Sequence, residues 1–263
     1  MDKTQNDMTP HDAAEALRWL SEMGADEIIG ESTVNRLVAP AAKATPAVAR
    51  GTAAPAAAPV VVAPGASATQ YQSLAEIRAA LEGFDACPLK KTATKLCYAD
   101  GNPQARVMLV GEVPDRDEDI QGQPFAGRAG LLLDRMLAAV GLSRSAQDRE
   151  SAVFITNTVF WRPPGNRTPT EAEFQMCLPF LLRTIELQKP DVIVCLGVTS
   201  SQRLTGKPDG ILKLRGKWVT TNVSGRNIPL LPTLHPAYLL RQPAHKRLAW
   251  RDMLMLRQML DAH

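Results

Sequence analysis

The stretch RVMLVGEVPDRDEDIQGQPFAGRAGLLLDRMLAAVGL, residues 106–142, contains the signals that decide the fold. It opens with a continuous apolar run, residues 106–112, which is typical of a strand that is buried on both faces. It closes with residues 129–142, where apolar side chains recur at helical spacing up to Gly141. The stretch therefore predicts a strand, a polar loop and a helix in succession.

The same order of elements repeats along the chain. Further strand-like runs occupy residues 153–160, 191–197 and 228–236, and helical patterns occupy residues 171–188 and 246–260. Strands that alternate with helices predict an α/β fold. We expect a three-layer α-β-α architecture with a central, mainly parallel four-stranded sheet. Such sheets bind ligands at the carboxyl ends of their strands.

Composition divides the chain into three parts. We expect an accessory helical segment over residues 1–32, an Ala/Pro-rich flexible linker over 33–69, and over 70–263 the domain that carries the candidate site. Residues 1–69 hold five basic and eight acidic side chains, whereas the rest hold 25 and 19. A basic body suits a polyanion such as nucleic acid, although many proteins that bind none are as basic. The partner of the N-terminal segment stays unknown.

The overall composition favours a cytoplasmic protein without a membrane partner. Hydrophobic residues make up 45% and charged residues 22% of the chain, as in ordinary globular proteins. No apolar run reaches the roughly 18 residues that a membrane span needs, and the polar N-terminus does not match a secretory signal. None of the four cysteines form a C-x-x-C pair, so disulfides are not expected.

The first candidate motif, residues 111–130, follows the first strand. Gly111 allows a sharp turn, and Glu112 and Asp115 place carboxylates at the mouth of the expected crevice. Phe125 lies between glycine and proline residues, a setting that favours packing or stacking of its ring. A polar loop with one buried phenylalanine would give the same pattern.

The second candidate motif, residues 156–170, follows the second strand. Asn157 offers one acceptor and two donors, which is what reading an amide-like base edge requires. Arg162, Asn166 and Arg167 flank a rigid Pro-Pro pair, which could hold two guanidinium groups toward phosphates at little entropic cost. A rigid surface loop without a ligand is the alternative.

The third candidate motif, residues 234–250, follows the fourth strand. His235 could donate a hydrogen bond to a developing anion, although a lone histidine is usually structural. Leu239, Leu240 and Arg241 could wedge into a stack of bases. Lys246 opens a helix, where it could meet a phosphate.

Together the motifs resemble family 4 of the uracil-DNA glycosylase superfamily. The resemblance covers residues 84–260 and rests on GE-x-P…D-x-x-G-x-PF-x-GRAG-x-LL, ITN-x-V-x-x-RPPGNRTPT and HPAYLLR-x-P…K…W. It implies a monofunctional base-excision repair enzyme that flips uracil out of single- or double-stranded DNA and hydrolyses its N-glycosidic bond. Uracil-containing DNA as the partner would associate the protein with the nucleoid.

The resemblance also implies roles for five residues. Phe125 would stack on the uracil in a pocket that Gly111 helps to form, and Asn157 would hydrogen-bond the polar edge of the base. His235 would stabilise negative charge at uracil O2 as the bond breaks. Glu112 would orient the attacking water or stabilise the cationic sugar.

The chain departs from the family pattern in its first motif. Val113 and Asp115 stand where the family usually has a small residue and a glycine, so Asp115 becomes a second candidate for the catalytic carboxylate. Two alternatives therefore stay open: a DNA-binding module of the same fold with reduced or no turnover, and a glycosylase for other deaminated bases. An unrelated nucleotide-binding α/β domain would explain the glycine-rich turn but not the three motifs together.

A second departure concerns iron. The family carries a 4Fe-4S cluster on four cysteines, and the corresponding positions here are Phe84, Cys87, Trp161 and Cys177. Since such clusters need four ligands, and two large aromatic residues replace two of them, we expect no cluster and no other metal or cofactor. Phe84 and Trp161 are expected to fill the volume with apolar packing.

Overall fold

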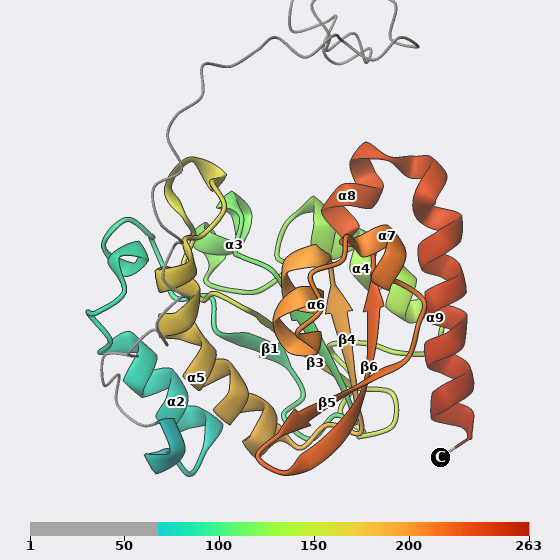
Figure 1. The fold of residues 1–263 in the computed structure, drawn as a ribbon, viewed down its shortest axis with the longest axis horizontal. Helices are drawn as coiled ribbons and strands as arrows, with labels where there is room; N and C mark the ends of the chain where they lie inside the picture. Colours follow the sequence, from blue (N-terminus) through green and yellow to red (C-terminus); the bar gives the residue numbers. More distant parts are fainter. Residues whose placement is uncertain (1–67, 263) are drawn as a thin grey trace, which may run out of the picture. The chain divides into compact units, whose positions relative to one another are not determined.

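The computed structural model describes residues 68–262, which form a six-stranded sheet with helices on both faces (Figure 1). The strands are β1 (Ala99–Gly101), β2 (Val107–Gly111), β3 (Val153–Asn157), β4 (Val192–Leu196), β5 (Val219–Val223) and β6 (Arg226–Thr233). Their order in the sheet is β1-β3-β2-β4-β6-β5. The four inner strands are parallel, and β1 and β5 pair antiparallel at the edges. The predicted α/β fold with a mainly parallel sheet is confirmed, but the predicted number of four strands is wrong.

The two strands that the sequence did not predict are the antiparallel edge strands. β1 consists of only three residues, Ala-Asp-Gly, none of them fully buried. In β5 buried and exposed side chains alternate over five residues, Val-Thr-Thr-Asn-Val. Neither strand has the apolar run that marks a strand buried on both faces, so both depend on pairing with a neighbour.

The helices form the outer two layers of the fold. α2 (Leu74–Glu82), α5 (Glu171–Gln188) and α6 (Val198–Thr205) pack on one face of the sheet, and α4 (Arg128–Ala138) and α9 (Lys246–Asp261) pack on the other. Along β2, Met108 and Val110 join the first apolar cluster, whereas Val107 and Leu109 join the second. This alternation is the pleat of a strand that is buried on both sides.

Shorter elements occupy the connections between the layers. They are the helices α3 (Arg116–Gln121), α7 (Ile211–Leu214) and α8 (Pro236–Arg241), and the single turns η1 (Ala68–Gln70), η2 (Pro88–Lys91), η3 (Pro164–Asn166) and η4 (Pro243–His245). In Figure 1, α3 and α8 lie at the end of the sheet toward which β4 and β6 point. The carboxyl ends of the parallel strands lie at this end.

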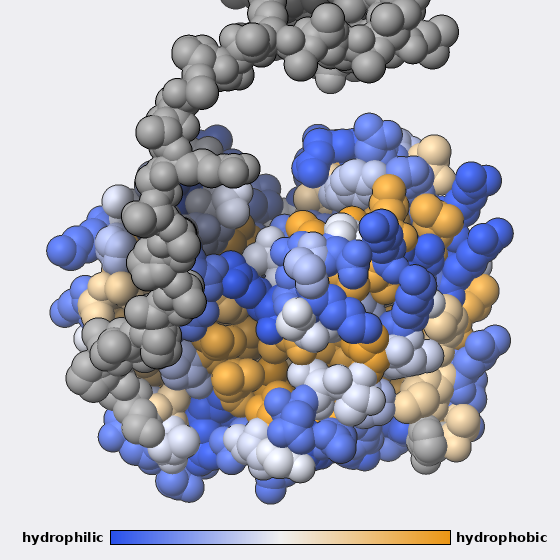
Figure 2. Space-filling view, viewed as in Figure 1, coloured by the Kyte–Doolittle hydropathy of each residue, from blue (hydrophilic) through white to orange (hydrophobic). Residues whose placement is uncertain are grey.

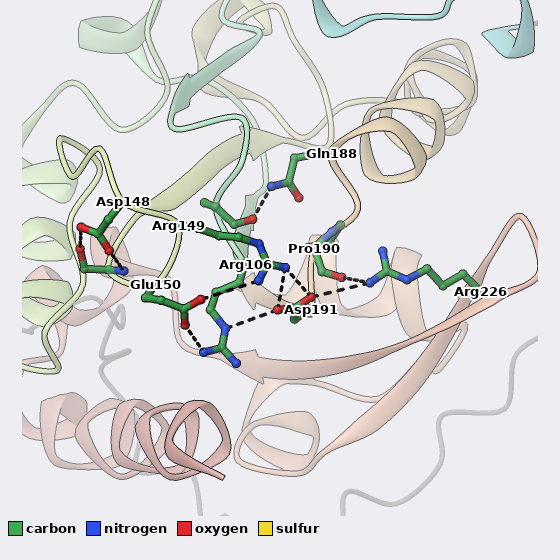
Figure 3. A network of polar contacts seen from close by, with 10 residues as sticks. Arg106, Asp148, Arg149, Glu150, Gln188, Pro190, Asp191 and Arg226 are labelled. Carbon is green, nitrogen blue, oxygen red and sulfur yellow. Dashed lines mark hydrogen bonds and ion pairs between the residues drawn. The ribbon is translucent and has the colours of Figure 1, made fainter. Parts of the chain in front are cut away.

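Ion pairs join the chain segments at the opposite edge of the sheet, where the parallel strands begin (Figure 3). Arg106 precedes β2 and pairs with Glu150 and with Asp191, whose Oδ2 lies 3.4 Å from the arginine Nε. Arg149 donates to both carboxylate oxygens of Asp191 at 2.9 Å, and Arg226 at the start of β6 lies 4.0 Å away. The network ties the starts of β2, β4 and β6 together.

A fully buried carboxylate connects α9 to the end of β6. Asp252 accepts hydrogen bonds from Thr233 Oγ1 at 2.6 Å and from Arg215 Nε at 3.0 Å. Thr233 is the last residue of β6, two residues before His235. The Asp252 carboxylate therefore holds in place the strand end from which the third motif continues.

The predicted N-terminal segment and nearly all of the predicted linker lie outside the described residues, because the description begins at Ala68. Within residues 68–262, none of the helices combines the length and the apolar character that crossing a membrane requires.

Replacing Asp252 by Ala is expected to lower the free energy of unfolding by about 3–5 kcal/mol, because the Arg215 charge and the Thr233 hydroxyl lose their buried partner. Urea denaturation measures the loss. Asp261→Ala is the matched control, since this exposed carboxylate of the same helix pairs only with Arg257 one turn away. That control should change stability little. Similar losses in the two variants would contradict the assignment of Asp252 as a buried anchor.

Candidate active site

Gly111 and Asn157 end the neighbouring strands β2 and β3 and are partners in the register of the sheet. A Cβ atom at position 111 would lie 2.2 Å from Asn157 Oδ1 and 2.7 Å from Cε2 of Phe125. Real Cβ atoms do not approach other atoms so closely, so only glycine fits. The Asn157 amide and the Phe125 ring therefore meet over the end of β2.

Phe125 is held in place from two sides. Its backbone has a positive φ of 53°, and its ring stacks on the imidazole of His235 with centroids 5.3 Å apart. Gly130, in the first turn of α4, lies so close that a Cβ there would be 1.7 Å from the Phe125 carbonyl oxygen. The first turn of α4 thus fixes the loop that presents the aromatic ring, and the ring links the first motif to the third.

The Glu112 carboxylate lies at the start of α6. Its Oε1 accepts a hydrogen bond of 2.7 Å from the backbone N–H of Thr199. Gly197 makes room for this contact, since a Cβ there would be 2.5 Å from the same oxygen. A negative charge is favourable at a helix N-terminus, where backbone N–H groups lack partners. Glu112 is therefore fixed at the carboxyl end of β4, next to its own strand β2.

His235 caps α8 with its imidazole. Its Nδ1 accepts a hydrogen bond of 3.2 Å from the backbone N–H of Ala237. Burial lowers the pKa of His235, while the nearby Glu112 charge opposes that shift and Arg241 adds to it. The ring is therefore neutral at neutral pH, and with Nδ1 as the acceptor its proton lies on Nε2. His235 thus offers a single fixed N–H donor.

One end of the sheet therefore gathers an aromatic ring, an amide, a carboxylate and a neutral imidazole donor. Figure 2 shows the molecular surface notched at this edge, between the helices that Figure 1 labels α3 and α8. The set combines stacking, reading of a polar edge, and groups of opposite electrostatic character. It suits a planar polar ring that becomes charged during a reaction.

Comparison with known proteins agrees with this geometry. A family model described as the uracil DNA glycosylase superfamily matches residues 98–254. The chain belongs to this superfamily. It is 39% identical over 181 residues to the type-4 uracil-DNA glycosylase of Saccharolobus solfataricus, a match that spans 67% of this chain and 81% of the relative. The type-4 enzyme of Thermotoga maritima is 43% identical over 162 residues, or 61% and 80% of the two chains. That of Archaeoglobus fulgidus is 38% identical over 176 residues, or 65% and 85%.

Two acidic residues of the first motif bind each other's backbone in this superfamily member. Asp115 caps α3, accepting hydrogen bonds from the N–H groups of Asp117 at 2.9 Å and Glu118 at 3.0 Å. Glu118 Oε2 accepts in return from the Asp115 N–H at 2.6 Å. The structure thus commits the Asp115 carboxylate to starting a helix. Sequence reasoning missed Glu118 as a site residue, although the D-x-x-E spacing is a capping-box signal.

The loop after β3 is braced by its own side chains. Arg167 forms a two-pronged ion pair with Glu173, with N–O distances of 2.8 and 2.6 Å, and this pair holds the pKa of Glu173 down to about 2. Arg162 Nε donates to Asn166 Oδ1 at 2.8 Å. Arg167 therefore fastens the loop to α5, whereas the sequence predicted it as a phosphate contact.

Of the two leucines of α8 that were predicted to wedge into a stack of bases, one is exposed and the other is buried. Leu239 is fully buried with Leu234 and Ala249, so it cannot reach a stack of bases as the sequence predicted. Its neighbour Leu240 is exposed, and so are Arg241 and Lys246. The sequence could not distinguish the two leucines, because which one faces the core depends on how the short helix docks.

The four positions that correspond to cluster ligands do not fit an iron–sulfur cluster. The rings of Phe84 and Trp161 stack with centroids 6.3 Å apart, and the edge of Phe84 meets Phe180 at 5.1 Å. Cys87 and Cys177 are both buried, and the interaction between their thiol groups lowers the pKa of Cys87 to about 7 and raises that of Cys177. Two thiols cannot supply the four thiolates of such a cluster.

Gly111→Ala is expected to lower the free energy of unfolding by about 1–3 kcal/mol, since the added methyl group must displace Asn157 or Phe125. Thermal and urea unfolding measure the loss. Gly210→Ala is the matched control, because that glycine has a φ of −68° and a Cβ there meets nothing within 4 Å. Unchanged stability in Gly111→Ala would show that the end of β2 is not closely packed.

Proposed function

We propose that this chain acts as a uracil-DNA glycosylase, hydrolysing the bond between uracil and deoxyribose in DNA and leaving an abasic site. Family membership and the relatives named above support this reaction. The single observation that extends it to this chain is the convergence of Gly111, Asn157 and His235 on the Phe125 ring. A base must leave the duplex to reach such an enclosed set of groups.

The pocket residues divide the recognition of uracil between them. The Phe125 ring stacks on the face of the flipped base, and the absence of a side chain at Gly111 lets this ring and the Asn157 amide lie together at the end of β2. The Asn157 amide pairs with the polar edge, accepting from N3–H and donating to O4. Cytosine presents the reverse pattern on the same edge, so an amide held in one orientation discriminates between the two bases.

The remaining two groups act on the charge that develops as the bond breaks. When the bond from C1′ to N1 breaks, its electron pair leaves with the uracil and the sugar becomes cationic. The His235 Nε2–H donates to uracil O2 and stabilises the anion. The Glu112 carboxylate faces the cation and orients the water whose oxygen bonds to C1′. Asp115 takes no part in this step, since its carboxylate caps α3.

Side chains around this pocket are proposed to contact the DNA. Arg241, the last residue of α8, and Lys246, the first residue of α9, are exposed and bind phosphates, and Arg162 with Asn166 does so from the loop after β3. The exposed Leu240 fills the gap that the flipped nucleotide leaves. We propose that both single-stranded and double-stranded DNA are substrates.

An oligonucleotide with one uracil tests the function, because alkali cleaves the abasic product. Strand cleavage supports the enzyme, whereas a mobility shift without cleavage would favour a DNA-binding module. Strands with hypoxanthine or xanthine show whether other deaminated bases are accepted.

His235→Ala is expected to slow single-turnover excision by about 10²–10³-fold, the usual loss when one donor to a developing anion is removed. Affinity for uracil-containing DNA should change little, because the bond strengthens mainly in the transition state. Rapid-quench kinetics and a binding titration on the same DNA separate the two quantities. A rate close to that of the wild type would move the anion-stabilising role to another donor.

We further propose that the chain folds and acts without an iron–sulfur cluster, and that the stacked rings of Phe84 and Trp161 take over its packing role. Protein purified without air is expected to contain no stoichiometric iron or sulfide and to lack visible absorbance, yet to excise uracil. Elemental analysis alongside the excision assay checks this prediction. Stoichiometric iron in the anaerobic sample, or activity that requires iron reconstitution, would contradict it.

A further inference from the structure

Glu118 is a buried carboxylate that contacts both residues proposed to hold the uracil. It belongs to α3 and is 6% exposed. Its Oε1 accepts hydrogen bonds from the backbone N–H of Phe125 and, at 3.5 Å, from Nδ2 of Asn157. Its Oε2 accepts from the backbone N–H of Asp115. One side chain thus connects the helix cap, the stacking residue and the base-reading amide.

An ionised carboxylate only accepts hydrogen bonds, so it dictates which end of the Asn157 amide faces it. The amide must present Nδ2 to Glu118, and its oxygen then lies on the other side, toward Gly111. Turning the amide by half a rotation would place its oxygen against the carboxylate and lose the bond. Glu118 therefore selects one of two amide orientations.

The two orientations match different bases. With Nδ2 on the Glu118 side, Oδ1 accepts from N3–H of uracil and the second Nδ2 hydrogen donates to O4. In the turned orientation, the amide would donate to N3 of cytosine and accept from its amino group. We infer that Glu118 is a positioning residue that sets the preference for uracil over cytosine by holding the Asn157 amide in its uracil-reading orientation. This inference rests on the proposed function.

The protonation state of Glu118 makes this preference depend on pH. Burial raises the pKa of Glu118 to about 7, and the hydrogen bonds from Phe125, Asp115 and Asn157 oppose that shift. The Asp115 charge adds to it, and the Cys97 thiol, which donates to the Glu118 carbonyl at 3.0 Å, is the other titratable neighbour. Below the pKa, the protonated carboxyl can donate to Asn157 Oδ1 and no longer excludes the turned amide. Discrimination should therefore rise as pH increases through about 7.

Glu118→Gln tests the inference, because glutamine keeps the shape but can accept from Asn157 Nδ2 or donate to Asn157 Oδ1, and so pairs with either orientation of the amide. Asp119→Asn is the matched control: Asp119 is the next residue of α3, is equally buried, and accepts only from Thr94 and Lys95. Single-turnover release of uracil and of cytosine from single-stranded oligonucleotides gives the selectivity of each protein from pH 6 to pH 8. Free uracil and free cytosine as competitive inhibitors give the same ratio where cytosine release is too slow to follow. Thermal unfolding reports structural loss.

Glu118→Gln is expected to reduce the uracil-over-cytosine ratio by about 10- to 100-fold at pH 8, the value of a hydrogen bond to a charged group. It should also abolish the rise of that ratio with pH. Asp119→Asn should keep the ratio and its pH dependence whatever its effect on stability. Unchanged ratios in Glu118→Gln, or equal changes in the control, would overturn the inference. Wild-type protein that releases no uracil would instead refute the proposed function.

Discussion

The site depends on the close approach of two side chains to the end of β2. This approach is possible because the residue there is a glycine, with a hydrogen atom in place of a side chain. At Gly111, the end of β2 has no side chain, so the Asn157 amide and the Phe125 ring occupy the space that a Cβ would take. The parallel pairing of β2 with β3 places Asn157 directly beside that gap. Stacking of Phe125 on His235 then extends the contact to the segment that follows β6. Three distant parts of the sequence thus meet because position 111 has no side chain.

The order of the strands explains why the proposed catalytic and binding groups come from different strands. β3, β2, β4 and β6 are neighbours in that order, and each contributes at its carboxyl end. β3 supplies Asn157, β2 supplies Glu112, the helix start after β4 supplies the N–H that holds this carboxylate, and β6 leads to His235. His235 and Glu112, the proposed donor and carboxylate, therefore follow different strands. A departing anion and a cationic sugar need groups on different sides.

The sequence predicted the alternating strands and helices, and it located the strands that are strongly apolar. Each of the four inner strands contains a buried, mostly apolar run, and the motifs follow these runs directly, so strand position alone brought Gly111, Glu112, Asn157 and His235 to one end of the sheet. It could not predict β1 and β5, whose residues are ordinary until a neighbour pairs with them. The partners of Arg167 and the burial of Leu239 likewise depend on how a loop and a short helix dock. Charge and hydrophobicity do not specify those contacts.

The departure at Asp115 has a structural rather than a catalytic consequence. A carboxylate at this position starts α3 by capping two of its N–H groups, and the reciprocal bond from Glu118 closes the capping box. That bond orients Glu118, whose other oxygen faces Phe125 and Asn157. A glycine would leave the first turn of α3 uncapped and the chain before it freer to move. Asp115 therefore rigidifies the loop that carries Phe125, and Glu112 remains the carboxylate that we propose to face the sugar.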